Sequence, residues 1–150
     1  MRIGLIGLGG MGRGLAKNMA AKGIDLTVSD LDQSRVDHAV GLGAKQGSTA
    51  AQMAADCDVL MICVTTAEAV QSIALGPDGA LAHMSPGDVL VDHTTVSAEH
   101  VDLMRAQCDA AGVRYAEAPM TRTPAHADRG EVNILFGGDE ELIEHLRPVF

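Results

Sequence analysis

The chain has 150 residues, 47% of them hydrophobic, which is the size of one ordinary domain with enough apolar material for a core. Its formal net charge of -9 argues against nucleic acid and anionic membranes as binding partners, because both bind basic protein surfaces. No apolar run approaches the roughly 18 residues of a membrane span and no targeting segment precedes the first strand, so we expect a cytoplasmic protein that binds neither nucleic acid nor membrane.

The cysteines and histidines show no disulfide or metal-ligand pattern. Cys57, Cys63 and Cys108 are widely spaced and include no C-x-x-C pair, so we interpret them as buried or incidental thiols. The six histidines likewise lack metal-ligand spacing and are interpreted as surface or hydrogen-bonded residues. We therefore expect no bound metal.

A glycine-rich motif joins the first expected strand to the first expected helix. The apolar run 2–6 leads directly into Gly7-Leu8-Gly9-Gly10-Met11-Gly12, which is G-x-G-x-x-G. A helical pattern follows over residues 14–22 and ends at Gly23. In such a motif Gly7 permits the tight turn, Gly9 lets the backbone approach a pyrophosphate, and Gly12 lets the helix pack on the sheet. The helix N-terminus then holds the phosphates.

The next expected strand, residues 26–29, ends at Asp30, close to the spacing of about 20 residues at which an acidic residue meets the adenosine ribose. A carboxylate there hydrogen-bonds the ribose of NAD and repels the additional phosphate of NADP. We therefore predict NAD rather than NADP. Arg35 is within reach of such a phosphate, but we interpret it as a solvated helix residue. The alternative for Asp30 is that it only begins a turn beside Asp32.

Strands and helices continue to alternate up to residue 116. Expected helices occupy residues 33–40 with Asp32 as N-cap, 49–55 with Ser48 as N-cap, 67–75 before a turn at Gly76-Pro77-Asp78-Gly79, and 98–111 before Gly112. Expected strands occupy residues 58–64, 88–92 and 113–116. The alternation indicates βαβ units, and therefore an α/β fold with a doubly wound parallel sheet of the Rossmann type between two helical layers.

Ligands of such sheets bind beyond the carboxyl ends of the strands. That edge is expected to collect Gly9 to Met11, Asp30, Val64-Thr65 and Thr94-Thr95. For Thr66 and Thr94, helix capping is an equally good interpretation.

The last third breaks the alternation. Residues 117–130 form a long segment with two prolines, and long segments of this kind are often functional. Residues 131–137 alternate like a half-exposed strand, and residues 139–150 begin a helix with an acidic first turn.

Four segments occur in a characteristic order: the glycine motif, Asp92-His93-Thr94-Thr95, Glu117-Ala118-Pro119-Met120 and the strand expected between Gly130 and Gly138. Together they resemble the β-hydroxyacid dehydrogenases, the group that contains 3-hydroxyisobutyrate dehydrogenase and is related to 6-phosphogluconate dehydrogenase. The resemblance implies an NAD(P)-dependent oxidoreductase that acts on a small β-hydroxy acid or the matching aldehyde. It places Gly10 and Met11 on the pyrophosphate, Asp30 on the ribose, and Val64 and Thr95 beside the nicotinamide half. Thr65, which lies next to Val64 at the same edge of the sheet, is also expected to bind the cofactor.

The expected substrate loop departs from the family pattern at Thr121-Arg122-Thr123. The family has Ser-Gly-Gly there, where a hydroxyl and free N–H groups hold the substrate carboxylate. The triplet is most similar to the Gly-Arg-Thr of the sulfolactaldehyde reductase branch, in which the arginine binds a strongly anionic group. We therefore predict that Arg122, with Thr121 and Thr123, binds a sulfonate, phosphate or carboxylate of a small anionic substrate. The alternative is a surface arginine paired with an acid such as Asp128.

The resemblance also implies residues that this sequence lacks. In the family a catalytic Lys and a nearby Asn lie on a later helix, before a helical domain that builds the oligomer; here no Lys follows Lys45. We therefore expect residues 1–150 to be the dinucleotide-binding domain of a longer homo-oligomeric enzyme, with no catalytic residue of its own and no activity alone. One alternative is a dinucleotide-binding module that does not turn over. Another, disfavoured by the pyrophosphate-type loop, is a methyltransferase with a nucleoside cofactor.

Overall fold

The computed structural model describes residues 1–76 and 78–150 of the chain. The strands in these residues are β1 (Arg2–Ile6), β2 (Asp25–Ser29), β3 (Lys45–Gln46), β4 (Val59–Ile62), β5 (Val89–Asp92) and β6 (Arg114–Glu117). The helices are α1 (Gly12–Ala21), α2 (Gln33–Gly41), α3 (Ala50–Asp56), α4 (Ala67–Leu75), the 3-10 helix η1 (Ala80–His83), α5 (Ala98–Ala111), α6 (Pro124–Asp128) and α7 (Glu140–Leu146).

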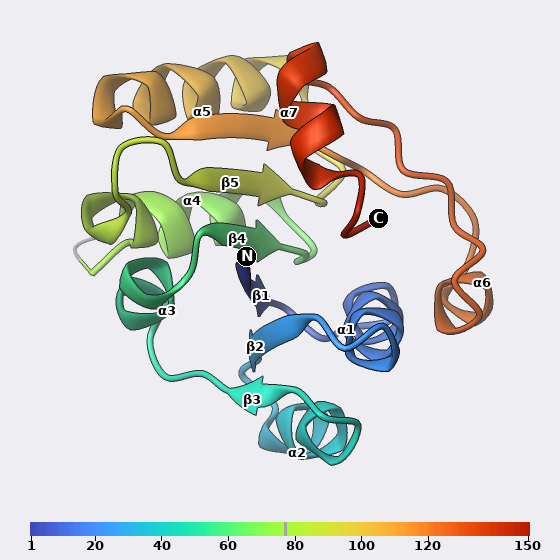
Figure 1. Cartoon of the computed structure of the whole chain (residues 1–150). Coiled ribbons are helices and arrows are strands. Elements are labelled where there is room, and N and C mark those ends of the chain that lie inside the picture. The colour runs from blue at the N-terminus through green and yellow to red at the C-terminus, as the bar shows by residue number, and fades with distance from the viewer. Residues whose placement is uncertain (77) are drawn as a thin grey trace.

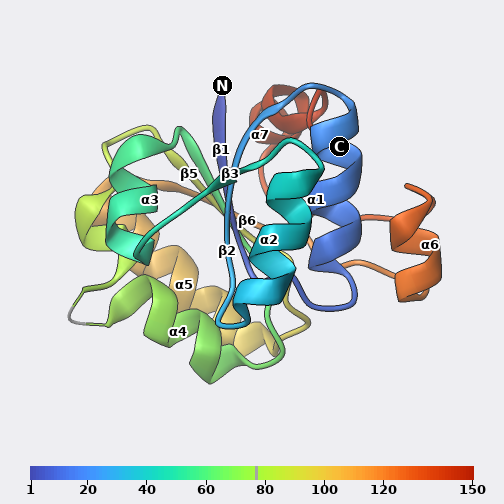
Figure 2. The same cartoon turned by 90° about the horizontal axis from the view of Figure 1, so that it is seen from below.

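The strands form one sheet in the order β3-β2-β1-β4-β5-β6, and every neighbouring pair is parallel. Figure 1 shows the chain running from β1 at the centre to β3 at one edge and then back across to β6 at the other. Helices α1, α2 and α7 lie on one face, and α3, α4 and α5 lie on the other (Figure 2). The expected doubly wound α/β fold with three layers is confirmed.

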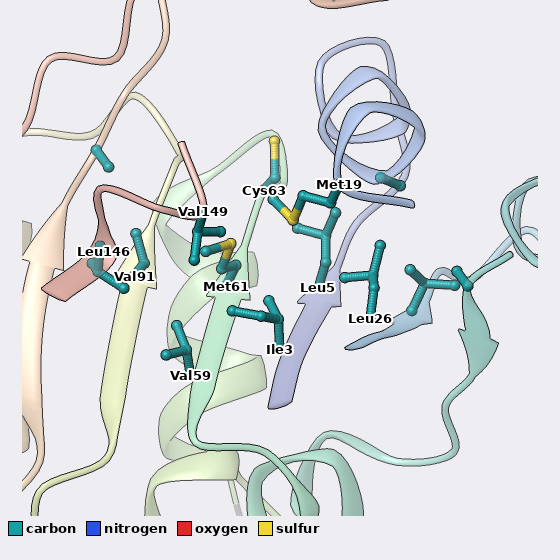
Figure 3. Close-up of a cluster of buried hydrophobic side chains, with 14 of the residues drawn as sticks. Ile3, Leu5, Met19, Leu26, Val59, Met61, Cys63, Val91, Leu146 and Val149 are labelled. Atoms are coloured by element: carbon teal, nitrogen blue, oxygen red, sulfur yellow. The ribbon is translucent and has the colours of Figure 1, made fainter. Parts of the chain in front are cut away.

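The central strands are buried on both faces because they are continuous apolar runs. The register aligns Leu5 with Met61 and Met61 with Val91, so one row of apolar side chains crosses the sheet. Met19 of α1 and Leu146 of α7 belong to the same buried cluster (Figure 3). A second cluster fills the opposite face beneath α3, α4 and α5.

The glycine motif forms the turn between β1 and α1. Gly7 has a φ of +99°, a conformation that favours glycine, and a side chain there would collide with the carbonyl of Cys63. Gly12 begins α1 so close to the carbonyl of Gly7 that a Cβ atom would overlap it. Apart from its chain neighbours, nothing lies within 4 Å of the position that a Cβ of Gly9 would take. The fold itself therefore requires Gly7 and Gly12, but not Gly9.

Residues 131–137 do not form the expected strand. They make two isolated antiparallel bridges, Glu117 with Gly137 and Met120 with Ile134. The N–H of Leu135 donates to the carbonyl of Pro119 between them, but proline has no N–H with which to complete that pair. The missing donor interrupts the ladder.

Some expected boundaries are also corrected. Thr49, not Ser48, is the N-cap of α3, because its hydroxyl accepts a hydrogen bond from the N–H of Gln52. The last helix ends at Leu146 rather than continuing to residue 150. The sequence did not predict β3, η1 or α6, which have two, four and five residues. The expected turn at residues 76–79 includes Pro77, which lies outside the described residues.

We expect Gly12→Ala to lower the free energy of unfolding by about 2 kcal/mol or more, because the new Cβ must displace backbone rather than a flexible side chain. Gly41→Ala is the matched control, since Gly41 ends α2 and has open space at its Cβ position. Urea unfolding of both variants measures the difference. A Gly12→Ala protein as stable as Gly41→Ala would show that the loop relaxes without cost.

Candidate functional site

The glycine loop and the ends of β2, β4 and β5 meet at one edge of the sheet. Two cavities lie there and share Gly9, Val64 and Thr65. The β2-side cavity, of about 650 Å³, lies between the end of β2 and α4. The β5-side cavity, of about 280 Å³, lies between the glycine loop and the segment that follows β5.

The structure brings all nine predicted cofactor residues together around these cavities. Gly7 and Asp30 line the β2-side cavity, Gly10, Met11, Gly12 and Thr95 line the β5-side cavity, and Gly9, Val64 and Thr65 line both. The predicted substrate residues, Thr121 to Thr123, line neither, although the preceding Met120 lines the β5-side cavity.

Sequence reasoning missed part of each cavity wall. Leu31 and Ile73 form apolar wall in the β2-side cavity, and Leu31 is fully exposed. The available signal was a lone leucine between Asp30 and Asp32 at the end of a strand. His93 lines the β5-side cavity, whereas the sequence treated it like the other histidines.

The Asp30 carboxylate connects the end of β2 to the glycine loop. Its Oδ2 accepts a hydrogen bond of 2.6 Å from the N–H of Leu8, and its Oδ1 accepts one of 2.9 Å from the N–H of Asp32. Asp30 therefore does organise the turn beside Asp32, and it organises the loop as well. The side chain is 10% exposed, lines the β2-side cavity and keeps lone pairs for a further donor.

Arg35 is a solvent-exposed residue of α2, as the sequence interpretation holds, and it is also paired with these aspartates. Its guanidinium lies 3.5 Å from the Asp30 carboxylate and 3.3 Å from that of Asp32, and it is half exposed. Water screens such a pair, so the pair adds little stability. Its consequence is a positive charge held at the edge of the β2-side cavity.

A basic groove of about 550 Å³ borders the outer side of the glycine loop. Its basic side chains come from two helices, Arg13 and Lys17 of α1 and Arg35 and His38 of α2. Asp128 also lines the groove and pairs with Arg13, so three permanent cations, those of Arg13, Lys17 and Arg35, and one carboxylate lie next to the loop in a chain of net charge -9.

The start of α1 presents backbone donors toward the same region. In the described part of the chain, no acceptor engages the N–H groups of Gly9, Gly10, Met11 or Gly12, and α1 has no side-chain N-cap. Unfilled N–H groups at a helix N-terminus attract an anion, and the helix dipole adds to the attraction.

Asp128 is not the partner of Arg122. The Asp128 carboxylate lies 2.8 Å from the Arg13 guanidinium, and its carbonyl accepts a hydrogen bond of 2.9 Å from Lys17. Arg122 is exposed and makes no ion pair with another described residue. Among the described non-glycine residues it alone has a positive φ, +75°, which costs an ordinary side chain roughly 1 kcal/mol.

His93 is buried with a defined tautomer. Its Nδ1 lies 2.7 Å from the carbonyl oxygen of Ala118, which only accepts, so the proton is on Nδ1 and Nε2 is an acceptor. The ring packs edge-on against Phe150 with a centroid distance of 5.8 Å. Burial lowers the pKa of His93 to about 4, so the ring is neutral at pH 7 and is no general acid there.

The threonines and cysteines of this region have structural roles. Thr66 caps α4 by accepting a hydrogen bond from the N–H of Ala69, so the capping interpretation is confirmed for this residue. Thr94 caps no described helix, and its hydroxyl accepts a hydrogen bond of 3.3 Å from the N–H of Val64. The three cysteines are buried, and burial raises the pKa of the Cys63 thiol to about 12.

Within residues 1–76 and 78–150, no group of His, Cys, Asp or Glu is arranged to hold a metal ion. None of the helices described there is long and apolar enough to cross a membrane.

A doubly wound parallel sheet, a glycine turn with free N–H groups and an acidic residue at the end of the second strand define a dinucleotide-binding domain. Residues 2–150 match the family described as the NAD binding domain of 6-phosphogluconate dehydrogenase. The chain belongs to this family, and its cofactor class is NAD.

The relatives include enzymes named as dehydrogenases and reductases, and also the cytokine-like nuclear factor N-PAC of Homo sapiens, which is 33% identical over 149 residues, covering 99% of this chain and 27% of that protein. The chain is 33% identical over 149 residues to the NAD-dependent L-serine dehydrogenase of Pseudomonas aeruginosa, covering 99% of this chain and 50% of that protein. It is 34% identical over 146 residues to the chloroplastic glyoxylate/succinic semialdehyde reductase 2 of Arabidopsis thaliana, covering 97% and 41%. The crystal structure of 3-hydroxyisobutyrate dehydrogenase from Salmonella typhimurium is similar with a TM-score of 0.92 at 27% identity, covering 99% and 52%. The chain thus spans half or less of the length of these curated relatives.

The lowered pKa of His93 makes stability depend on pH. Because the pKa falls from 6.5 to about 4 on folding, unfolding takes up a proton between these values and stability decreases with acidification. We expect the step from pH 7 to pH 5 to cost roughly 2 kcal/mol through this residue. Urea unfolding at both pH values should show that His93→Leu removes this part of the dependence, whereas the exposed-site control His38→Leu keeps it. Equal pH dependence in wild type and His93→Leu would contradict the assignment.

Proposed function

We propose that the protein containing residues 1–150 is an NAD-dependent oxidoreductase that transfers a hydride between nicotinamide and a small anionic β-hydroxy acid or its aldehyde. These residues form its dinucleotide-binding domain. The observation that carries the proposal is the arrangement of free N–H groups in the glycine loop and the Asp30 carboxylate around two joined cavities. The bound NAD supplies the hydride acceptor or donor, and the domain orients it.

The two cavities take the two halves of the cofactor. In the β2-side cavity Asp30 accepts hydrogen bonds from the adenosine ribose, and the apolar wall at Leu31 and Ile73 suits the adenine. The glycine loop holds the pyrophosphate, and the β5-side cavity receives the nicotinamide half. The assigned cofactor residues are Gly7, Gly9, Gly10, Met11, Gly12, Asp30, Val64, Thr65 and Thr95.

Arg122, between Thr121 and Thr123, binds the anionic group of the substrate. Its support is a guanidinium without an ion-pair partner among the described residues, held in a strained backbone conformation. The names of three of the similar enzymes also support an anionic substrate, because L-serine, glyoxylate, succinic semialdehyde and 3-hydroxyisobutyrate all carry a carboxylate. We propose that this anionic group is a carboxylate, and substrates that carry a sulfonate or a phosphate are the ones to compare with it.

No residue of this chain is assigned the proton transfer that accompanies hydride transfer. His93 is neutral and its proton is engaged, and no lysine follows Lys45. We propose that the proton donor comes from outside residues 1–150. A dinucleotide-binding module would bind the same cofactor without turnover, so NADH oxidation by the full gene product with glyoxylate or succinic semialdehyde separates the two functions.

The cofactor proposal predicts saturable binding of NADH, at least about tenfold tighter than NADPH, because Asp30 accepts the free ribose hydroxyl and repels a phosphate. Nicotinamide fluorescence measures both in a protein without Trp and with one Tyr. Gly9→Ala should weaken NADH binding about tenfold or more at unchanged stability, since its Cβ enters open space that the pyrophosphate needs. Gly41→Ala should leave binding unchanged. Absence of NADH binding by the folded wild type would reject the proposal.

The substrate proposal predicts opposite effects of Arg122 on stability and catalysis. Arg122→Gly should raise the free energy of unfolding by about 1 kcal/mol because it relieves the left-handed conformation, whereas Arg122→Ala should not. Both should raise the substrate KM of the full gene product about tenfold to a hundredfold and leave the NADH Kd unchanged. Equal effects of either variant on substrate and cofactor would contradict this role.

A further inference from the structure

A chain of polar side chains, three of them buried and one partly buried, lies behind the rim of the β5-side cavity. It links Gln71 of α4, His100 of α5, Asp92 at the end of β5, and Thr94 two residues further on. His100, Asp92 and Thr94 are 5%, 0% and 3% exposed, so water does not satisfy them.

The contacts converge on Asp92 from two sides. The amide Nε2 of Gln71 donates to Nδ1 of His100 at 3.2 Å, so the proton of His100 is on Nε2, which lies 3.4 Å from Oδ2 of Asp92. Oδ1 of Asp92 accepts a hydrogen bond of 2.8 Å from the N–H of Thr94. Oγ1 of Thr94 then accepts one of 3.3 Å from the N–H of Val64. The ends of β4 and β5 are thereby joined to α4 and α5.

Asp92 depends on this arrangement. Burial raises the pKa of its carboxyl, and hydrogen bonds from Thr94 together with His100 oppose that rise. Oδ2 of Asp92 and Nε2 of His100 make no hydrogen bond with a described residue, and the 3.4 Å contact between them is the one polar contact that each has there. Removal of the imidazole therefore leaves one side of a buried carboxylate without a partner, and the carboxylate must move or take up a proton.

We propose that His100 is a positioning residue for the nicotinamide half of the cofactor site. It acts through Asp92 and Thr94 on two rim residues: Thr95, which lines the β5-side cavity, and Val64, which lines both cavities. This inference rests on the proposed cofactor binding. The network shares no contact with Asp30, whose carboxylate is held from Leu8, Asp32 and Arg35. Loss of His100 therefore weakens contacts to nicotinamide and spares contacts to adenosine diphosphate.

Calorimetric titration with NADH and with ADP-ribose, which lacks the nicotinamide, tests the inference. His100→Leu should weaken NADH binding about tenfold and change ADP-ribose binding less than about twofold. His100→Gln, which retains an N–H donor, should restore NADH binding to within about threefold of wild type. Met104→Ala is the control, because Met104 is buried on the same helix and takes part in none of the polar contacts of the network; it should lower Tm and leave both affinities unchanged.

Thr94→Val provides a second test, should His100→Leu fail to fold, because it removes the acceptor of the Val64 N–H and keeps the backbone hydrogen bond from residue 94 to Asp92. It should reproduce the selective loss of NADH affinity. The positioning role would be overturned if these variants lost affinity for both ligands equally, if they lost affinity for neither, or if His100→Gln failed to restore NADH binding. In each of these cases, NADH binding by the wild type would still support the proposed function. A folded wild type that binds neither ligand would overturn both.

Discussion

All six strands run parallel, and this one constraint places the site. Parallel strands end on the same edge of the sheet, so segments separated by dozens of residues are brought to one line. From β1 the chain adds β2 and β3 on one side of β1, and it then crosses over to add β4, β5 and β6 on the other side. This change of side leaves a crevice beyond the carboxyl ends of β1 and β4. Gly9 after β1 and Val64 after β4 both border that crevice, and they are shared by the two cavities. The place of the site is thus a consequence of topology before any side chain is considered.

An acidic chain accommodates an anionic ligand here by local means. The net charge is -9, yet the glycine loop carries unfilled N–H groups where it enters α1, and a groove lined by basic side chains borders the loop. Asp30 is compatible with this because its two oxygens hold the loop and the turn, and Arg35 lies beside it. Asp30 therefore serves the geometry of the glycine loop, besides the recognition of a ribose that we propose for it.

The segment that follows β6 is tied to the same loop. Helix α6 packs on α1 so closely that a side chain at Gly14 would overlap Ala127, and Asp128 is held by Arg13 and Lys17. The α1 helix thus connects the proposed cofactor loop with the proposed substrate loop. Arg122 stands in this tethered segment in a conformation that glycine adopts more easily, so the surrounding contacts keep the arginine where it is at a cost in backbone energy.

The sequence alone determined the longer helices, the buried strands and the fold class, because apolar periodicity, glycine spacing and helix caps are local properties. The run of β4, the G-x-G-x-x-G turn and the acid after β2 were sufficient for a doubly wound sheet and for the nine residues now found around two cavities. Only the tertiary structure decided which groups meet. The loss of the strand at 131–137 follows from pairing opposite Pro119, and the pairing of Arg35 follows from how the β2 turn folds back. The burial of His93 depends on packing against Phe150, far along the chain, and no local pattern records a contact of that kind.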